Sequence, residues 1–268
     1  MNLTETPSAI VTRLRSAGCV YPEDEARLLV SEAQTPGDLA AMVDRRAAGL
    51  PLEHVLGWAE FCGLRIAVAP GVFVPRPHTE FLVREATSLA QPGAVVLDLC
   101  CGSGALGVAL VAALGQAELH ATDIDAAAVT CARRNVAAGG HVYEGDLYEP
   151  LPAELRGRVD ILLANAPYVP TDAIAQMPRE AREHEPLVAL DGGADGLAML
   201  RRVSAEAPLW LAPGGHLLVE TSERQASRAV ETVAANGLLP RVARSEEMNA
   251  AVVVATRPAA DIVTTDAG

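Results

Sequence analysis

The segment Asn165-Ala-Pro-Tyr168 carries the residue types best suited to hold a reacting polar group. It follows Asp160–Ala164, a short and mostly apolar run that is typical of a buried strand. In an open α/β sheet, ligands bind just beyond the carboxyl ends of the strands. There an amide oxygen, a main-chain carbonyl and a ring face would meet a ligand together. A strand-ending turn with a packed tyrosine is the alternative, because proline turns after strands are common.

A second constellation follows the predicted strand Val95–Leu99 and opens a helix. Gly102, Gly104 and Gly107 match the pattern G-x-G-x-x-G, and Asp123 ends the next predicted strand. Such glycines let the main chain approach a nucleotide, while the carboxylate binds the ribose hydroxyls. The spacing predicts a nucleotide site, with a tight strand-to-helix turn as the structural alternative.

Acidic residues at three successive strand ends indicate which nucleotide this is. Asp98 precedes the glycines, Asp123 ends the second strand, and Asp146 follows the third with Leu147 beside it. A pyrophosphate binds best where a helix N-terminus has no negative charge nearby, which disfavours NAD. A ligand with an ammonium group and a ribose but no phosphate fits better, so we expect S-adenosylmethionine. Asp146 would accept a hydrogen bond from the adenine amine, with Leu147 against the ring.

A sulfonium methyl donor gives the Asn165 segment a defined task. The leaving group departs neutral and no metal is needed, so the protein must mainly align a nucleophile. For an NH2 group conjugated to a carbonyl or a ring, the Asn165 side-chain oxygen and the Ala166 carbonyl would accept its two N–H bonds. Both interactions strengthen as positive charge develops on nitrogen, and Tyr168 would pack on the plane. We expect no metal site.

The elements that position these residues predict an α/β protein with a mostly parallel sheet and helices on both faces. The expected strands are 95–99, 118–122, 141–143, 160–164 and 216–220, followed by an antiparallel pair at 239–244 and 250–256. The expected helices are 104–114, 125–138, 195–211 and 223–236.

Four segments are expected along the chain. Residues 1–57 form a helical domain that either caps a substrate or is purely structural. Residues 58–77 form a hairpin linker, in which Leu64–Val68 pairs with Val72–Val74 around the turn Pro70-Gly71. Residues 78–257 form the catalytic domain, and 258–268 form a disordered polar tail.

Composition narrows the possible partners and compartments. The net charge of −13 disfavours a nucleic-acid backbone as partner. The five cysteines are odd in number and form no C-x-x-C pair, which predicts a reducing cytoplasm. No apolar run is long enough to cross a bilayer, and the N-terminus has no signal-peptide pattern.

Several motifs give residues 51–225 a resemblance to the protein-(glutamine-N5) methyltransferases, which modify the GGQ glutamine of peptide-chain release factors. The matching segments are Pro51-Leu-Glu-His-Val-Leu-Gly57, Phe61-Cys-Gly-Leu64, Val74-Pro-Arg-Pro-His-Thr-Glu80, Asp98-Leu-Cys-Cys-Gly-Ser-Gly104, Gly145-Asp-Leu-Tyr-Glu-Pro150, Asn165-Ala-Pro-Tyr-Val-Pro170 and His184-Glu-Pro-Leu-Val-Ala-Leu190. The resemblance implies a class I, Rossmann-like methyltransferase fold with a seven-stranded sheet and a release factor as partner.

The resemblance also assigns residues. By resemblance, the donor would contact the loop Cys100, Cys101, Gly102, Ser103 and Gly104, and then Asp123, Leu147 and Asn165. The strand-end acids Asp98 and Asp146 are expected at the same site from their positions alone. The substrate amide would lie on Asn165, Ala166, Pro167 and Tyr168, the catalytic group. Arg76 and Glu80, in a family-specific segment, are assigned to substrate binding, although solvated charges are the usual fate of such residues.

Three departures from the family pattern bear on the function. Ala166 stands where the family has the first proline of Asn-Pro-Pro-Tyr, Cys100-Cys101 replaces Gly-Thr, and the N-terminal helical part is shorter. The main hypothesis is glutamine methylation. The alternatives are N-methylation of another amide or of an exocyclic amine, in a small molecule or a nucleobase, and donor binding without catalysis.

Overall fold

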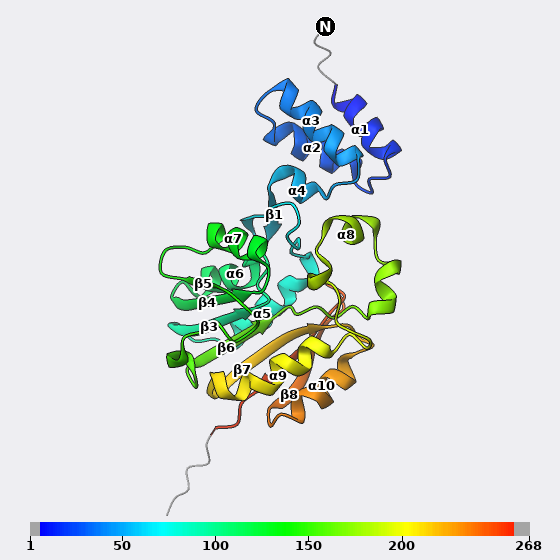
Figure 1. The fold of residues 1–268 in the computed structure, drawn as a ribbon. Coiled ribbons are helices and arrows are strands. Elements are labelled where there is room, and N and C mark those ends of the chain that lie inside the picture. Colours follow the sequence, from blue (N-terminus) through cyan, green and yellow to red (C-terminus); the bar gives the residue numbers. More distant parts are fainter. Residues whose placement is uncertain (1–5, 260–268) are drawn as a thin grey trace, which may run out of the picture.

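The structure, a computed structural model, describes residues 6–259 and consists of a small helical part and a larger α/β part (Figure 1). The predicted tail lies outside the described residues from residue 260 onward. Within the described range, none of the helices combines the length and the hydrophobicity needed to cross a membrane.

The N-terminal part contains the helices predicted for this region. They are α1 (Pro7–Ser16), α2 (Pro22–Glu32), α3 (Pro36–Ala47) and α4 (Leu52–Leu56). The first three begin with proline, which is favoured at this position because its missing N–H would have no helical partner. Ile10, Leu14, Leu29 and Val43 are fully buried and give these helices a core of their own.

A β-hairpin connects the two parts, but its strands differ from the predicted ones. It pairs β1 (Trp58–Phe61) with β2 (Leu64–Ala67). Cys62 and Gly63 both have positive φ angles, 51° and 73°, as a two-residue hairpin turn with matching twist requires. The prediction that Val72–Val74 is the partner strand was therefore wrong. That segment runs without regular structure toward Pro75 and Pro77.

The larger part is built on a seven-stranded sheet within residues 94–256, which confirms the predicted fold class. The strands are β3 (Ala94–Leu99), β4 (Ala117–Asp123), β5 (His141–Glu144), β6 (Val159–Ala164), β7 (Leu211–Thr221), β8 (Leu239–Ser245) and β9 (Ala250–Thr256). Their spatial order is β5-β4-β3-β6-β7-β9-β8, and only β9 runs antiparallel to its neighbours.

Helices cover both faces of this sheet (Figure 1). They are α5 (Glu80–Leu89), α6 (Ala105–Leu114), α7 (Ala126–Asn135), α9 (Ala198–Trp210) and α10 (Ala226–Ala234). The short helix α8 (Arg179–His184) lies apart from the sheet, toward the N-terminal helices (Figure 1). Because side chains alternate along a strand, Leu97 and Leu99 of β3 pack with α9 and α10, while Val96 packs with α5 and α6. The sheet is thus buried on both sides, as parallel sheets usually are.

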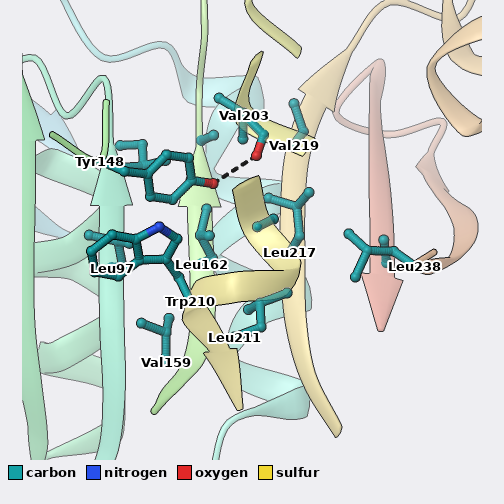
Figure 2. Close-up of a cluster of buried hydrophobic side chains, with 14 of the residues drawn as sticks. Leu97, Tyr148, Val159, Leu162, Val203, Trp210, Leu211, Leu217, Val219 and Leu238 are labelled. Carbon is teal, nitrogen blue, oxygen red and sulfur yellow. Dashed lines mark hydrogen bonds between the residues drawn. The ribbon is translucent and has the colours of Figure 1, made fainter. Parts of the chain in front are cut away.

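One core cluster fixes the loop that follows β5 (Figure 2). Tyr148 is buried, and its hydroxyl donates a hydrogen bond to the Val203 carbonyl in α9 at 2.8 Å. The Tyr148 ring stacks on Trp210, with 5.5 Å between the ring centroids. Leu147 precedes this anchor, so its main chain is set by the core beneath it.

The strand order brings two segments far apart in sequence side by side. From β3 the chain continues to β4 on one side and later returns to β6 on the other, with Leu99 opposite Ala164. Neighbouring strands lie about 4.8 Å apart. Cys100 and Asn165 therefore leave adjacent strand ends, at a switch point where open α/β sheets bind ligands.

Candidate active site

A cavity of about 460 Å³ opens at the carboxyl ends of β3, β4, β5 and β6. This volume lies in the range of small-molecule sites. Among the predicted residues, those that line it are Arg76, Cys100, Cys101, Gly102, Ser103, Asp123, Asp146, Leu147, Asn165, Ala166, Pro167 and Tyr168. The structure therefore brings the glycine loop and the Asn165 turn to one cavity.

The glycine loop is shaped by main-chain hydrogen bonds and by left-handed residues. The Cys101 N–H donates to the Thr122 carbonyl at 3.0 Å, and the Gly102 N–H donates to Asp123 Oδ2 at 2.8 Å. Cys100 and Gly102 have φ angles of 54° and 55°, a region that costs energy for a residue with a side chain. A Cβ atom on Gly102 would meet nothing within 4 Å, so the space beside it is open. Gly104 does not line the cavity and is instead the N-cap residue of α6.

Asp98 does not lie where the sequence placed it. Its carboxylate is 1% exposed and is not among the cavity-lining residues. Its Oδ2 accepts the Gly107 N–H at 2.9 Å, while Oδ1 has no hydrogen-bond partner in the described chain. Burial, and to a lesser degree the charge of Asp123, raises its pKa to about 7 against the Gly107 hydrogen bond. Asp98 thus supports the first turn of α6 from beneath the loop.

Asp123 lines the cavity as predicted, and its neighbour was missed. Besides the Gly102 bond, its Oδ1 accepts the Asp125 N–H at 2.9 Å. Burial raises the pKa of this carboxyl, and the N–H donors partly offset the effect. Ile124 also lines the cavity and is 55% exposed, so it offers an apolar wall beside the carboxylate. An apolar residue just after a strand-end acid is the sequence signal that could have identified it.

The loop after β5 contributes Asp146 and Leu147. Asp146 Oδ2 accepts a hydrogen bond from the Arg202 guanidinium at 2.7 Å, and Arg202 also lines the cavity. Leu147 is buried and adopts a φ of 49°, which is uncommon for a branched side chain. The Gly145 N–H donates to the Asp123 carbonyl at 3.0 Å, so the loops after β4 and β5 are joined.

The Asn165 turn presents acceptors that the described chain leaves unused. Asn165 is half-buried and lines the cavity, and its side-chain amide makes no hydrogen bond with residues 6–259. Ala166 is 3% exposed, and within the same range its carbonyl accepts no hydrogen bond. Two oxygen acceptors therefore remain available for a ligand beside the glycine loop.

The back of this turn is tightly held, in part by Gln225 and Gly192, which were not predicted from the sequence. Gln225 Nε2 donates to the Tyr168 carbonyl at 2.9 Å. The Val169 N–H donates to the Leu190 carbonyl at 3.2 Å, and the Gly192 N–H donates to the Val169 carbonyl at 2.8 Å. A Cβ atom on Gly192 would lie 2.7 Å from the Pro167 carbonyl oxygen, closer than side chains approach. Gly192 is therefore required by a close approach of two backbone segments.

The Tyr168 side chain is fixed at its hydroxyl. It donates to Oε1 of Glu220, a buried residue at the end of β7, at 3.0 Å. Burial, and then the charge of Glu220, raises the pKa of the Tyr168 phenol, so it stays protonated. His78, in the 3-10 turn η1 (Pro77–Thr79), lies 3.3 Å from the same oxygen and lines the cavity.

Arg76 and Glu80, predicted together, have separate roles. Arg76 lines the cavity and donates to both carboxylate oxygens of Glu185, at 2.6 Å each. This pair joins the Pro-Arg-Pro segment to the His-Glu-Pro segment, whose carboxylate is 1% exposed. Glu80 does not line this cavity, because it faces the hairpin and accepts the Cys62 N–H at 2.8 Å. The cavity lining therefore gives no support to the assignment of Glu80 to the substrate site.

The N-terminal helices reach the cavity wall through one arginine. Arg46 of α3 is buried and donates to Glu180 of α8 at 2.6 Å. It also donates to Glu25 of α2, again at 2.6 Å. Glu180 lines the cavity, so the small domain and the wall of the site are joined by an ion pair.

Comparison with known proteins adds to this geometry. Residues 63–184 match the family model of the methyltransferase small domain. The chain is 42% identical to a release factor glutamine methyltransferase of Geobacter sulfurreducens, over 71% of this chain and 68% of that protein. It is 37% identical to a 4-amino-L-phenylalanine/4-methylamino-L-phenylalanine methyltransferase of Streptomyces pristinaespiralis, over 75% and 76% of the two chains. A solved methyltransferase from Pyrococcus furiosus shares the fold, with a TM-score of 0.56 over 73% of this chain and 90% of that chain at 17% identity.

Proposed function

Because this chain belongs to the release factor glutamine methyltransferase family, we propose that it transfers a methyl group from S-adenosylmethionine to a glutamine side-chain amide. The proposed substrate is the GGQ glutamine of a peptide-chain release factor. The observation that carries the proposal is the pair of unused acceptors, the Asn165 amide oxygen and the Ala166 carbonyl, in one cavity with the glycine loop.

The residues present fit the methyl donor. The open space beside Gly102 admits a ligand close to the main chain, and Asp123 offers carboxylate lone pairs for ribose hydroxyls. Ile124 and Leu147 supply apolar walls for a base, and Asp146 lies at the same rim. Bound there, the donor supplies an electrophilic methyl on a positively charged sulfur that leaves as a neutral thioether.

The acceptor residues act on the substrate nitrogen. Hydrogen bonds from its two N–H groups to Asn165 Oδ1 and the Ala166 carbonyl would turn its lone pair toward the donor and strengthen as positive charge develops. A nitrogen–carbon bond forms as the carbon–sulfur bond breaks, and the nitrogen then releases a proton. The methylated amide keeps one N–H and can satisfy only one of the two acceptors. This arrangement favours a single methylation.

The partner and the compartment follow from the same proposal. The N-terminal helices would dock the release factor, and the Arg46–Glu180 ion pair would fix the position of these helices relative to the cavity wall. The five cysteines are free thiols in the described chain, in keeping with a cytoplasmic protein of translation.

The test is incubation of the protein with labelled donor and each release factor of its host. The peptide that contains GGQ should gain one methyl group, on the glutamine, by fragment mass spectrometry. A release factor with that glutamine changed to glutamate is the matched control and should stay unlabelled. Absence of labelling on every release factor would remove the proposed substrate.

A second candidate is an amine of a small molecule, since one relative of similar identity is named for 4-amino-L-phenylalanine. In this chain Ala166 stands in place of the first proline of the family turn, so the acceptor segment departs from the family pattern. The same assay with 4-amino-L-phenylalanine distinguishes the two. Turnover of the free amino acid without labelling of release factor would support this candidate.

A further inference from the structure

Glu220 is a buried carboxylate that the proposed reaction does not use directly. It lies at the end of β7, one residue past the point where Val219 pairs with Ala164 of β6. It is 4% exposed, and its Oε1 faces both the Tyr168 hydroxyl at 3.0 Å and His78 Nε2 at 3.3 Å. Its Oε2 has no hydrogen-bond partner in the described chain. A strand-end carboxylate here repeats the feature found at the other strand ends.

The charges around Glu220 identify its counter-ion. A buried carboxylate is costly unless a cation or several donors compensate it. Arg76 is nearby, but its guanidinium is already bound to both oxygens of Glu185. The neighbouring strand β9 offers Val252, which is apolar. Among the described residues this leaves His78, whose side chain is 39% exposed and borders the cavity.

The pKa of His78 agrees with this role. Its hydrogen bond and charge interaction with Glu220 raise the pKa, while burial and the charge of Arg76 lower it by a smaller amount. The imidazolium is therefore more populated near neutral pH than in a free histidine.

We propose that Glu220 is a positioning residue that holds the Tyr168 ring against the substrate amide, with protonated His78 as its counter-ion. The Tyr168 turn is then fixed at two points, its hydroxyl by Glu220 and its carbonyl by Gln225. This inference rests on the proposed function, because it assigns Tyr168 to the substrate amide.

A pH dependence follows from the pair. At a pH below the raised pKa of His78, the imidazolium balances Glu220 and the ring is held. As pH rises through that pKa, Glu220 loses its counter-ion, and turnover should decline on the alkaline side. Glu220→Gln keeps an acceptor for the tyrosine hydroxyl but needs no counter-ion, so its alkaline decline should be absent.

A double-mutant cycle tests whether Glu220 acts through Tyr168. Glu220→Gln should lower kcat about fivefold at neutral pH, because a neutral acceptor replaces a charged one, and it should leave the donor Kd unchanged. In a Tyr168→Phe background the same change should lower kcat by less than about twofold, because the contact is already absent. Glu223→Gln, at an exposed neighbour paired with Arg244, is the control with wild-type rates. Equal losses in both backgrounds would overturn the proposal.

The counter-ion can be tested without any turnover. An NMR titration of the six histidines, with the His78 signal identified by its loss in His78→Gln, should show a pKa for His78 that falls in Glu220→Gln. An unchanged His78 pKa would overturn the proposal even in an active enzyme. If no substrate is methylated, the proposed function fails while this titration still decides the Glu220–His78 pair.

Discussion

The glycine loop and the Asn165 turn line one cavity, but they are built in different ways. In the donor half, the carboxylates already hold groups of the protein, since Asp123 accepts two main-chain N–H bonds and Asp146 binds Arg202. In the acceptor half, the Asn165 amide and the Ala166 carbonyl have no partner within residues 6–259. One half is held by the groups that face the ligand, and the other is held from behind so that its acceptors stay available.

The two halves also differ in where their supports lie in the sequence. Gly102 is held by Asp123, 21 residues away, at the next strand end. Tyr168 is held by Glu220 of β7, which is 52 residues away, and by Gln225 at the N-terminus of α10, which is 57 residues away. Local support tolerates variation elsewhere in the chain, whereas the acceptor half should be sensitive to changes that touch no ligand.

Substitution of Asn165 should have the largest effect on the acceptor half. Asn165→Ala should lower kcat by roughly a hundredfold to a thousandfold, the usual effect of removing one preorganised polar group. The donor Kd should change little, because the donor half is held without Asn165. Asn165→Asp keeps an acceptor oxygen and should retain more turnover. Steady-state kinetics and calorimetric titration with donor separate the two effects, and wild-type turnover in the alanine variant would refute this role.

A matched pair of glycine substitutions separates the halves. Gly192→Ala places a Cβ within 2.7 Å of the Pro167 carbonyl oxygen, so the turn must shift. We expect a loss in kcat of roughly tenfold to a hundredfold with the donor Kd preserved.

Gly102→Ala should do the reverse. Its φ of 55° is strained for alanine by about 1–2 kcal/mol, and the new methyl enters the open space beside the loop. Donor affinity should fall by about tenfold or more, as a consequence of both effects. If each variant changed donor affinity and kcat equally, the two halves would not be independent.

Asp98 links the structure of the donor half to the pH dependence of the protein's stability. The folded protein holds a proton on Asp98 up to a pH of about 7, while the unfolded chain releases it near its ordinary, lower pKa. The free energy of unfolding should therefore decrease as pH rises through this interval. Asp98→Asn keeps an acceptor for the Gly107 N–H and should lose this component of the pH dependence. Urea unfolding at several pH values checks it, and parallel pH dependences for both proteins would contradict it.

Ala166→Pro should have the smallest effect. The Ala166 N–H donates no hydrogen bond within residues 6–259, so proline removes none there. Restricting the turn should raise kcat by a few-fold, corresponding to at most about 1 kcal/mol of preorganisation. A fall in kcat would mean that the alanine is needed for this chain's own substrate.

The donor half and the acceptor half also differ in how much of their structure could be predicted from the sequence. Strands β3 to β9 were predictable because apolar runs and glycine spacing are local signals, and the glycine loop was predicted together with Asp123. The hairpin was misassigned because Cys62-Gly63 is a less familiar turn than Pro70-Gly71, although its two positive φ angles suit the hairpin. Asp98 and Glu80 do not line the cavity, because each accepts a main-chain N–H, a contact that a sequence does not show. Gln225 and Gly192 were missed because their roles depend on tertiary contact alone.

The most direct test of the account is a crystal structure with S-adenosylhomocysteine and a glutamine peptide. In that complex, we expect the glutamine side-chain nitrogen to lie about 2.9 Å from both Asn165 Oδ1 and the Ala166 carbonyl oxygen, and to face the sulfur. A glutamine nitrogen bound elsewhere, or an Asn165 side chain turned away from it, would contradict the account.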